Sequence, residues 1–257
     1  MNSRSATQPI QGQAGAIHVD DGGTGNVPVV FLHSYAGDSR HWENQLEHLR
    51  SKRRAIAIDL RGHGQSAAPK NADYSIPSLM RDLEAVVEAL DLRRFVLVGH
   101  SMGGSIAVAY AGAHTDKVAG LVLAGTPGKT PPEMADQVMK SMEQDYEKVS
   151  QGYWNKLLAN GSPEVQSRIK REIGSVPREA SLKIIRALFD YNPIPALKAY
   201  PGPKLILFTP DGDTPTALHR AVSGLNSRQI SGTSHWMHLD IPNDFNRILD
   251  EFLDTVG

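Results

Sequence analysis

One short motif in this chain could carry nucleophilic chemistry. Residues Gly99 to Gly103 read Gly-His-Ser-Met-Gly, with Ser101 at the centre, between the apolar run 94–98 and a helix start rich in small residues. A serine on a sharp strand-to-helix turn takes strained backbone angles, and glycine two residues to either side permits the close approach that such a turn needs. The turn also places Ser101 at a helix N-terminus, where aligned N–H groups favour developing negative charge. The alternative is a serine that only caps a glycine-rich turn.

A serine hydroxyl needs a base, and the base needs an acid that orients it. We predict His235 as the base, because it follows the last predicted strand through a glycine-containing loop and precedes the C-terminal helix. His238, one helical turn later, is the alternative and could instead support His235 from behind. The other histidines are interpreted as turn, surface or helix-end residues: His18, His33, His41, His48, His63, His100, His114 and His219.

The acid is expected to follow another strand at the same sheet edge. The segment 208–215 supplies Asp213 and Asp211 directly after an apolar run, and we predict Asp213, with Asp211 as the alternative. Asp213 precedes Thr214-Pro215, so it could also serve as a helix cap, since proline suits the first helical turn. Asp59 follows a strand as well, but it begins a tight loop and is interpreted as structural.

Short β-branched runs alternate with helical patterns along most of the chain, which predicts an α/β fold. A mostly parallel central sheet with helices on both faces accounts for continuous apolar strands. The expected strands are Ala16–Asp20 at an edge, then Val27–Leu32, Arg54–Leu60, Arg94–Val98, Val118–Leu123, Lys204–Phe208 and Arg228–Ile230. Apolar residues at the 3.6-residue period predict helices over Tyr74–Leu92 and Ser101–His114, with further helical elements over Thr216–Val222 and Asn243–Leu253.

The stretch 127–200 interrupts this alternation, because it holds no strand-like run and shows helical spacing instead. We therefore expect residues 1–126 and 201–257 to form the core and residues 127–200 to form an inserted helical cap. The Met and Tyr side chains on its helical spacing are interpreted mainly as packing residues, some of which could line a pocket.

Composition excludes several classes of function. The chain has 257 residues, a formal net charge of −1 and no cysteine. Near-zero charge disfavours nucleic-acid binding, and the lack of cysteine removes disulfides, thiolate nucleophiles and cysteine-ligated metal sites. No apolar run is long enough to span a membrane, and the polar residues 1–13 do not resemble a secretory signal. We expect a cytoplasmic protein that needs no cofactor or metal.

The order Ser101, Asp213, His235 is typical of the α/β-hydrolase superfamily, and the chain resembles that superfamily over nearly its full length. The matching pieces are Leu32-His33 with Gly37, Asp59–Ser66, Gly99–Gly104, Asp213, and Gly232 with His235 followed by Pro242. The resemblance implies the α/β-hydrolase fold and a Ser-His-Asp triad, and says almost nothing about the substrate.

The same resemblance implies an oxyanion hole formed by the backbone N–H groups of Tyr35 and Met102. Relatives usually carry His-Gly where this chain has His33-Ser34. Ser34 could donate an additional hydrogen bond or, as we favour, narrow the acyl pocket. Trp236 is a second candidate substrate contact, with packing against the C-terminal helix as the alternative.

The leading functional hypothesis is a carboxylesterase-like enzyme acting on small or medium uncharged esters. Serine at position 101 argues against haloalkane dehalogenases and epoxide hydrolases, whose equivalent residue is aspartate. The alternatives are lactone, thioester or C–C bond hydrolysis on the same triad, and a ligand-sensing regulator or receptor of this fold with slow turnover.

Overall fold

We describe the protein from a computed structural model that places residues 6, 7 and 9–256. Residues 1–5, 8 and 257 lie outside this description, so the expectation for the N-terminal stretch 1–13 falls partly outside it. Among the residues that are placed, no helix is both long enough and apolar enough to cross a membrane.

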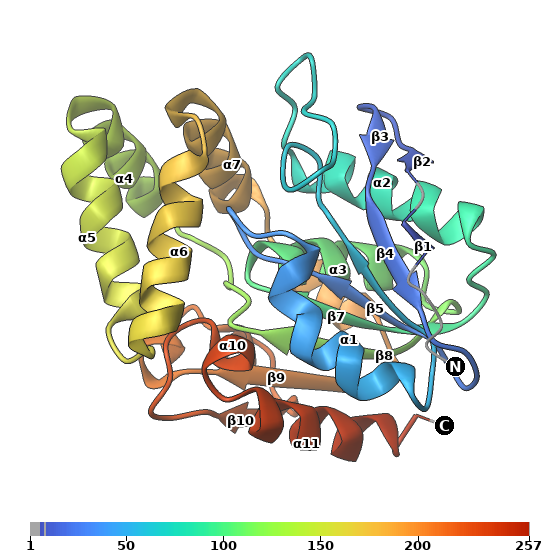
Figure 1. The fold of residues 1–257 in the computed structure, drawn as a ribbon. Coiled ribbons are helices and arrows are strands. Elements are labelled where there is room, and N and C mark those ends of the chain that lie inside the picture. Colours follow the sequence, from blue (N-terminus) through green and yellow to red (C-terminus); the bar gives the residue numbers. More distant parts are fainter. Residues whose placement is uncertain (1–5, 8, 257) are drawn as a thin grey trace.

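A mixed sheet of eight strands forms the centre of the protein (Figure 1), in the order β1-β4-β6-β5-β7-β8-β9-β10. The strands from β6 to β10 in this order are parallel, whereas β4 and β1 add antiparallel strands at one edge. The strands are β1 (Ala6–Thr7), β4 (Val19–Gly22), β5 (Val29–Leu32), β6 (Ala55–Ile58), β7 (Phe95–His100), β8 (Val118–Ala124), β9 (Lys204–Phe208) and β10 (Asn226–Gln229), with β2 (Ile10–Gln11) and β3 (Ala16–Ile17) paired separately.

Side chains along each strand point alternately to the two faces of the sheet, and burial of both faces explains why the central strands are apolar at every position. In β5, Val29 and Phe31 belong to one buried cluster while Val30 and Leu32 belong to the other. Because successive side chains point to opposite faces, both faces must be covered. Helices α1 and α11 contribute to the first cluster, and α2 and α3 to the second. The predicted fold class is therefore confirmed.

Helices account for most of the remaining chain, and five of the described ones lie between β8 and β9. Four of these, α4 to α7, form a group of their own beside the sheet (Figure 1), whereas α8 packs on α3 at Gly112. The helices are η1 (Ser39–Trp42), α1 (Glu43–Arg50), α2 (Ile76–Ala89), α3 (Met102–Ala113), α4 (Pro132–Gln144), α5 (Tyr146–Leu158), α6 (Pro163–Ser175), α7 (Arg178–Asp190), α8 (Ile194–Ala199), η2 (Pro210–Gly212), α9 (Leu218–Ala221), α10 (Met237–Asp240) and α11 (Pro242–Leu253).

Register brings the candidate site residues to one edge of the sheet. Leu32 pairs with Gly99, Gly99 pairs with Leu123, and Ala124 pairs with Leu207, so β5, β7, β8 and β9 all end at the same edge. The loops after β5, β7 and β9 carry Ser34, Tyr35, Ser101 and Asp213, which the sequence singles out, and His235 follows β10. Crevices at the carboxyl ends of parallel strands are where α/β sheets hold their ligands.

Candidate active site

Ser101 occupies the turn between β7 and α3 in a strained conformation, with φ 52° and ψ −111°. A positive φ is sparsely populated by residues with a Cβ atom and costs roughly 1–3 kcal/mol unless the surroundings enforce it. Here the Ser101 N–H donates to the Ala124 carbonyl of β8 at 2.9 Å. The next strand therefore holds the strained turn in place.

The two flanking glycines are required by close contacts. A Cβ atom on Gly99 would lie 2.5 Å from the carbonyl oxygen of Gly103. A Cβ atom on Gly103 would overlap the Leu32 carbonyl oxygen, and its distance from the His33 carbonyl oxygen would be 2.5 Å. The start of α3 and the loop after β5 thus pack backbone against backbone, which any larger residue would prevent.

The loop after β5 is fixed by a buried histidine in a defined tautomer. The Nε2 atom of His33 accepts a hydrogen bond from the Leu60 N–H at 2.9 Å, so Nδ1 carries the proton and donates to the Ser34 carbonyl at 2.7 Å. The Ser34 carbonyl also accepts from the Gly37 N–H, and the Ser34 hydroxyl donates to the Tyr35 carbonyl at 3.3 Å. The loop is rigid, and the Ser34 hydroxyl is occupied by backbone.

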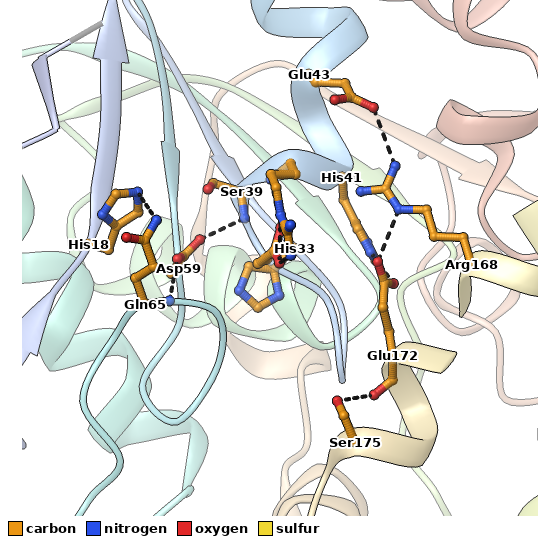
Figure 2. Close-up of polar contacts among 12 residues, drawn as sticks. His18, His33, Ser39, His41, Glu43, Asp59, Gln65, Arg168, Glu172 and Ser175 are labelled. Carbon is orange, nitrogen blue, oxygen red and sulfur yellow. Dashed lines mark hydrogen bonds and ion pairs between the residues drawn. The ribbon is translucent and has the colours of Figure 1, made fainter. Parts of the chain in front are cut away.

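Asp59, which directly follows β6, stabilises the loop after β5 through hydrogen bonds that Figure 2 shows. One carboxylate oxygen accepts the Ser39 N–H at 2.7 Å, and the other accepts the Gln65 N–H at 2.8 Å. The carboxylate joins the loops after β5 and β6, in agreement with its structural interpretation from sequence.

The Tyr35 and Met102 N–H groups are among the backbone donors that remain unpaired at this edge of the described chain. Among the described residues, neither the Tyr35 N–H nor the Met102 N–H has a hydrogen-bond acceptor. Met102 begins α3, where unpaired N–H groups are expected, and Tyr35 lies in the loop that Gly103 contacts. Unpaired backbone N–H groups of this kind can donate to an anionic oxygen atom.

His235 approaches the same edge from the loop after β10. Its N–H donates to the Leu157 carbonyl, and its carbonyl accepts from the Nε2 atom of His100, both at 2.9 Å. The His235 ring lies over Gly125, where a Cβ atom would be 2.6 Å from Cε1. Gly125 directly follows the residue whose carbonyl holds Ser101, so both side chains belong to the end of β8.

His238 is located differently from His235. It is fully buried, and its ring stacks on Trp42 with centroids 4.2 Å apart. His235 is only half-buried. The packing of His238 inside the core favours a structural role and favours His235 as the base.

The two candidate acids lie in the loop after β9. The Asp213 carboxylate accepts hydrogen bonds from Arg220 Nε at 2.5 Å and Nη2 at 2.6 Å, and from His219 Nε2 at 2.8 Å. Arg220, and then His219, hold the pKa of Asp213 well below its usual range. Asp211 is exposed. Within the described residues the His235 ring makes no side-chain hydrogen bond, so the structure brings Ser101 and His235 to one edge without placing Asp213 on the imidazole.

Side chains from α5 and α7 cover the site. The Tyr35 ring stacks on Trp154 with centroids 5.0 Å apart and an interplanar angle of 5°. The hydroxyl groups of Tyr35 and Tyr146 both donate to Ser181 Oγ, at 2.9 and 2.7 Å. Trp236 is buried and its ring centroid lies 6.5 Å from that of Trp154. Sequence reasoning did not single out Trp154 or Ser181, because their helical spacing is equally typical of packing.

Trp154 also lines a cavity of about 570 Å³ between α5 and α6. The same indole therefore borders open space on one side and the Tyr35 loop on another. Both polar and apolar residues line the cavity, including Tyr146, Asn155, Lys170, Ile173 and Arg178.

A network of polar contacts around Glu172 joins α6 to η1 and α1 (Figure 2). His41 Nε2 lies 2.7 Å from a Glu172 carboxylate oxygen, and Arg168 contacts both Glu172 at 3.0 Å and Glu43 at 3.3 Å. The His41 side chain is 1% exposed. Arg168, Glu172 and Glu43 are 24, 19 and 62% exposed, so the network joins α6 to α1 largely at the surface.

Burial controls the protonation of the histidines in this region. Desolvation lowers the pKa of His235 to about 4 and lowers the pKa of four other imidazoles: His33, His63, His100 and His238. At neutral pH the lowered pKa leaves the His235 imidazole uncharged.

These buried imidazoles predict acid sensitivity. In the unfolded chain each has a pKa near 6.5, so below that pH the unfolded state binds more protons than the folded state. Each histidine then lowers the stability progressively as the pH falls from about 6.5 toward its lower folded pKa. We expect the free energy of unfolding in urea to fall steeply from about pH 7 to about pH 5, where carboxylates change little. A flat profile would show that these histidines are hydrated in the folded protein.

Comparisons with known proteins agree with this geometry. Residues 27–162 match the family described as the alpha/beta hydrolase fold. Epoxide hydrolase 3 of Xenopus tropicalis is 26% identical, over 96% of this chain and 79% of its own. An esterase structure from Exiguobacterium antarcticum is 27% identical with a TM-score of 0.80, covering 97% of this chain and all 100% of its own. A solved N-acyl homoserine lactone degrading enzyme is 26% identical with a TM-score of 0.83, over 95% of this chain and 100% of its own.

The family match covers more than half of the chain, and the strained serine turn lies inside the matched segment. The central sheet, its covering helices and the whole-length structural matches lead to the same assignment. The chain belongs to the α/β-hydrolase family and is a hydrolase of that fold.

Proposed function

We propose that the protein hydrolyses small to medium carboxylic esters through a covalent acyl-enzyme formed on Ser101. The carrying observation is the strained Ser101 turn, with two unpaired backbone N–H groups at the same sheet edge. A nucleophile forced to protrude beside preorganised donors is the arrangement that acyl transfer requires.

The proposed reaction uses Ser101 Oγ as the nucleophile and His235 as the base. Oγ attacks the ester carbonyl carbon while its proton moves to His235, and the resulting oxyanion accepts hydrogen bonds from the Tyr35 and Met102 N–H groups. The C–O bond then breaks, and the alkoxide leaves as an alcohol with the proton from His235. Water, deprotonated by His235, attacks the acyl carbon, and cleavage of its bond to Oγ releases the acid and restores Ser101.

The residue type at position 101 decides between ester and epoxide chemistry. Attack of a serine oxygen on an epoxide carbon would form an ether, which water does not cleave readily. Attack on an ester carbonyl forms an acyl ester, which the same base and donors can hydrolyse. Ser101 therefore supports ester hydrolysis, although several relatives are named as epoxide hydrolases.

Contacts around the site support a substrate of modest size. Tyr35 is held by stacking on Trp154 and by its hydrogen bond to Ser181. Its loop is therefore fixed, which limits the space for a substrate beside the proposed oxyanion donors. Ser34 and Trp236, the proposed substrate contacts, are both buried. We propose that residues 127–200, chiefly α4 to α7, act as a cap that encloses the acyl group.

The function can be tested by labelling and turnover together. A fluorophosphonate probe is expected to label the protein, with peptide mapping placing the label on Ser101. Multiple turnover is expected with p-nitrophenyl acetate and butyrate, less with octanoate, and none with an epoxide. A simple lactone belongs in the panel because it is a cyclic ester. A single slow burst without turnover would support the ligand-sensing alternative, and epoxide opening without labelling would overturn the proposal.

Gly125→Ala tests the position of His235. The new Cβ atom would lie 2.6 Å from His235 Cε1, and the φ of +57° at this position is unfavourable for alanine. We expect the ring to be displaced and kcat for p-nitrophenyl acetate to fall by about 100-fold, because small misplacements of catalytic groups have effects of this size.

Gly174→Ala is the matched control. Gly174 lies in α6 with no atom within 4 Å of the position of its missing Cβ. Alanine there is expected to keep kcat unchanged and to raise stability slightly, by about 0.5–1 kcal/mol. Equal rates in the two variants would show that His235 does not need its place over Gly125.

A further inference from the structure

We propose that Asp240 is a positioning residue that clamps the His235 loop to the helical cap, an inference that rests on the proposed function. Asp240 ends the short helix α10, directly after the His235 loop. It is half-buried, and sequence reasoning did not identify it.

Both carboxylate oxygens of Asp240 are used, and they face different parts of the molecule. Oδ2 accepts from the N–H of Ser234 at 2.8 Å and from its hydroxyl at 2.5 Å. Oδ1 accepts from the N–H of Ser162 at 2.8 Å. Ser162 caps α6, so one side chain joins the residue before His235 to the start of a cap helix.

The clamp extends to both sides of His235. Ser234 Oγ, which donates to Asp240, also accepts from the Trp236 N–H at 3.1 Å. The His235 N–H itself bonds to the carbonyl of Leu157, at the end of α5. The backbone of the proposed base is therefore held between the cap turn 157–162 and the Asp240 carboxylate.

Close packing confirms that the cap turn and the His235 loop touch at this point. A Cβ atom on Gly161 would lie 2.9 Å from Cβ of Ser234. Among the described residues, Asp240 has hydrogen-bond partners but no ion-pair partner within 4.0 Å. Its hydrogen-bond donors are neutral and belong to two separate segments of the chain. Asp240 therefore links these segments and takes part in no salt bridge within the described residues.

The variant Asp240→Asn is expected to lose one of the two sets of hydrogen bonds that Asp240 accepts. Asparagine has one acceptor oxygen, so its NH₂ group must face either the Ser162 N–H or the Ser234 donors. We expect kcat for p-nitrophenyl acetate to fall by about 10- to 100-fold. KM is expected to stay within about threefold, because Asp240 does not contact the proposed oxyanion donors. Asp240→Glu keeps both oxygens and is expected to recover part of kcat.

Amide hydrogen exchange supplies a readout independent of turnover. In Asp240→Asn, the amides of Ser162, Ser234 and His235 are expected to exchange at least about tenfold faster, while those of β7 and β8 keep their protection. Asp244→Asn, which alters an exposed residue of α11 paired with Arg247, is the control and should change neither readout.

The outcomes distinguish the clamp from the esterase proposal. Unchanged exchange at Ser162 and His235, or kcat within about twofold of wild type, overturns the clamp. Faster exchange at both amides in a protein that hydrolyses no ester supports the clamp and overturns the esterase proposal instead. Faster exchange throughout the sheet would show that Asp240 supports general stability, which also overturns a positioning role.

Discussion

Ser101→Ala is expected to lower kcat for p-nitrophenyl acetate by about 10⁴- to 10⁶-fold, the range found when the nucleophile of a serine triad is removed. Without Oγ no acyl-enzyme forms, and water must attack an ester held only by the Tyr35 and Met102 N–H groups. Initial rates at saturating ester, together with loss of fluorophosphonate labelling, measure the effect.

Ser105→Ala is the matched control, because Ser105 lies one turn further along α3 and is buried. Its removal is expected to change kcat by less than about threefold. If Ser101→Ala kept its labelling, or if Ser105→Ala lost it, the assignment of the nucleophile would be wrong.

Ser101→Gly shows whether the loss of activity is separate from loss of fold. The positive φ at this position strains a residue with a Cβ atom but not glycine. We expect the glycine variant to be inactive and yet about 1 kcal/mol more stable than wild type, since relief of strain exceeds the added chain entropy. Urea unfolding measures the difference, and a less stable glycine variant would show that the surroundings of Ser101 contribute more than the strain removes.

The strands and the serine turn could be predicted because their causes are local. Apolar runs such as 94–98 must be buried on both faces, and Gly99 is required by a contact with Gly103 within the same turn. Gly103 is recognisable from the same local motif, although the contacts that require it are with the distant Leu32 and His33.

Helix α6 lies in the stretch 127–200 that was expected to be helical, but its bounds were not predicted. Its start carries a recognisable signal, since Ser162 caps it, Pro163 follows and Glu164 lies in the first turn.

The contacts that complete the site could not be predicted from the sequence. The stack of Tyr35 on Trp154 and the hydrogen bond from Ser162 to Asp240 join residues far apart in the chain. Their formation depends on how α5 and α6 pack against the sheet. Apolar periodicity predicts which face of a helix is buried, but it does not predict which element that face contacts. The same limit applies to Asp213, whose position after β9 is local but whose partners His219 and Arg220 depend on the fold of the loop.

Asp213→Asn is expected to lower kcat by about 10⁴-fold, while Asp211→Asn stays within about twofold of wild type. We propose that Asp213 leaves Arg220 and His219 and accepts a hydrogen bond from His235 as the imidazolium forms. An amide at this position can neither stabilise the imidazolium nor hold the correct tautomer. Initial rates of the two variants compare the candidate acids, and the reverse order of effects would exchange their roles.

Arg220→Gln tests whether Asp213 must change partners. In the structure burial alone acts on His235 and lowers its pKa to about 4, whereas a neighbouring carboxylate would raise that pKa by favouring the charged imidazole. Weakening the grip of Arg220 on Asp213 is therefore expected to move the acid limb of kcat/KM to higher pH, and Asp213→Asn in the same background should move it back. The limb reports the free enzyme, so it measures the carboxylate before substrate binds. An acid limb that stays in place in Arg220→Gln, combined with full activity in Asp213→Asn, would mean that Ser101 and His235 act as a dyad and that Asp213 serves only to fasten the loop after β9.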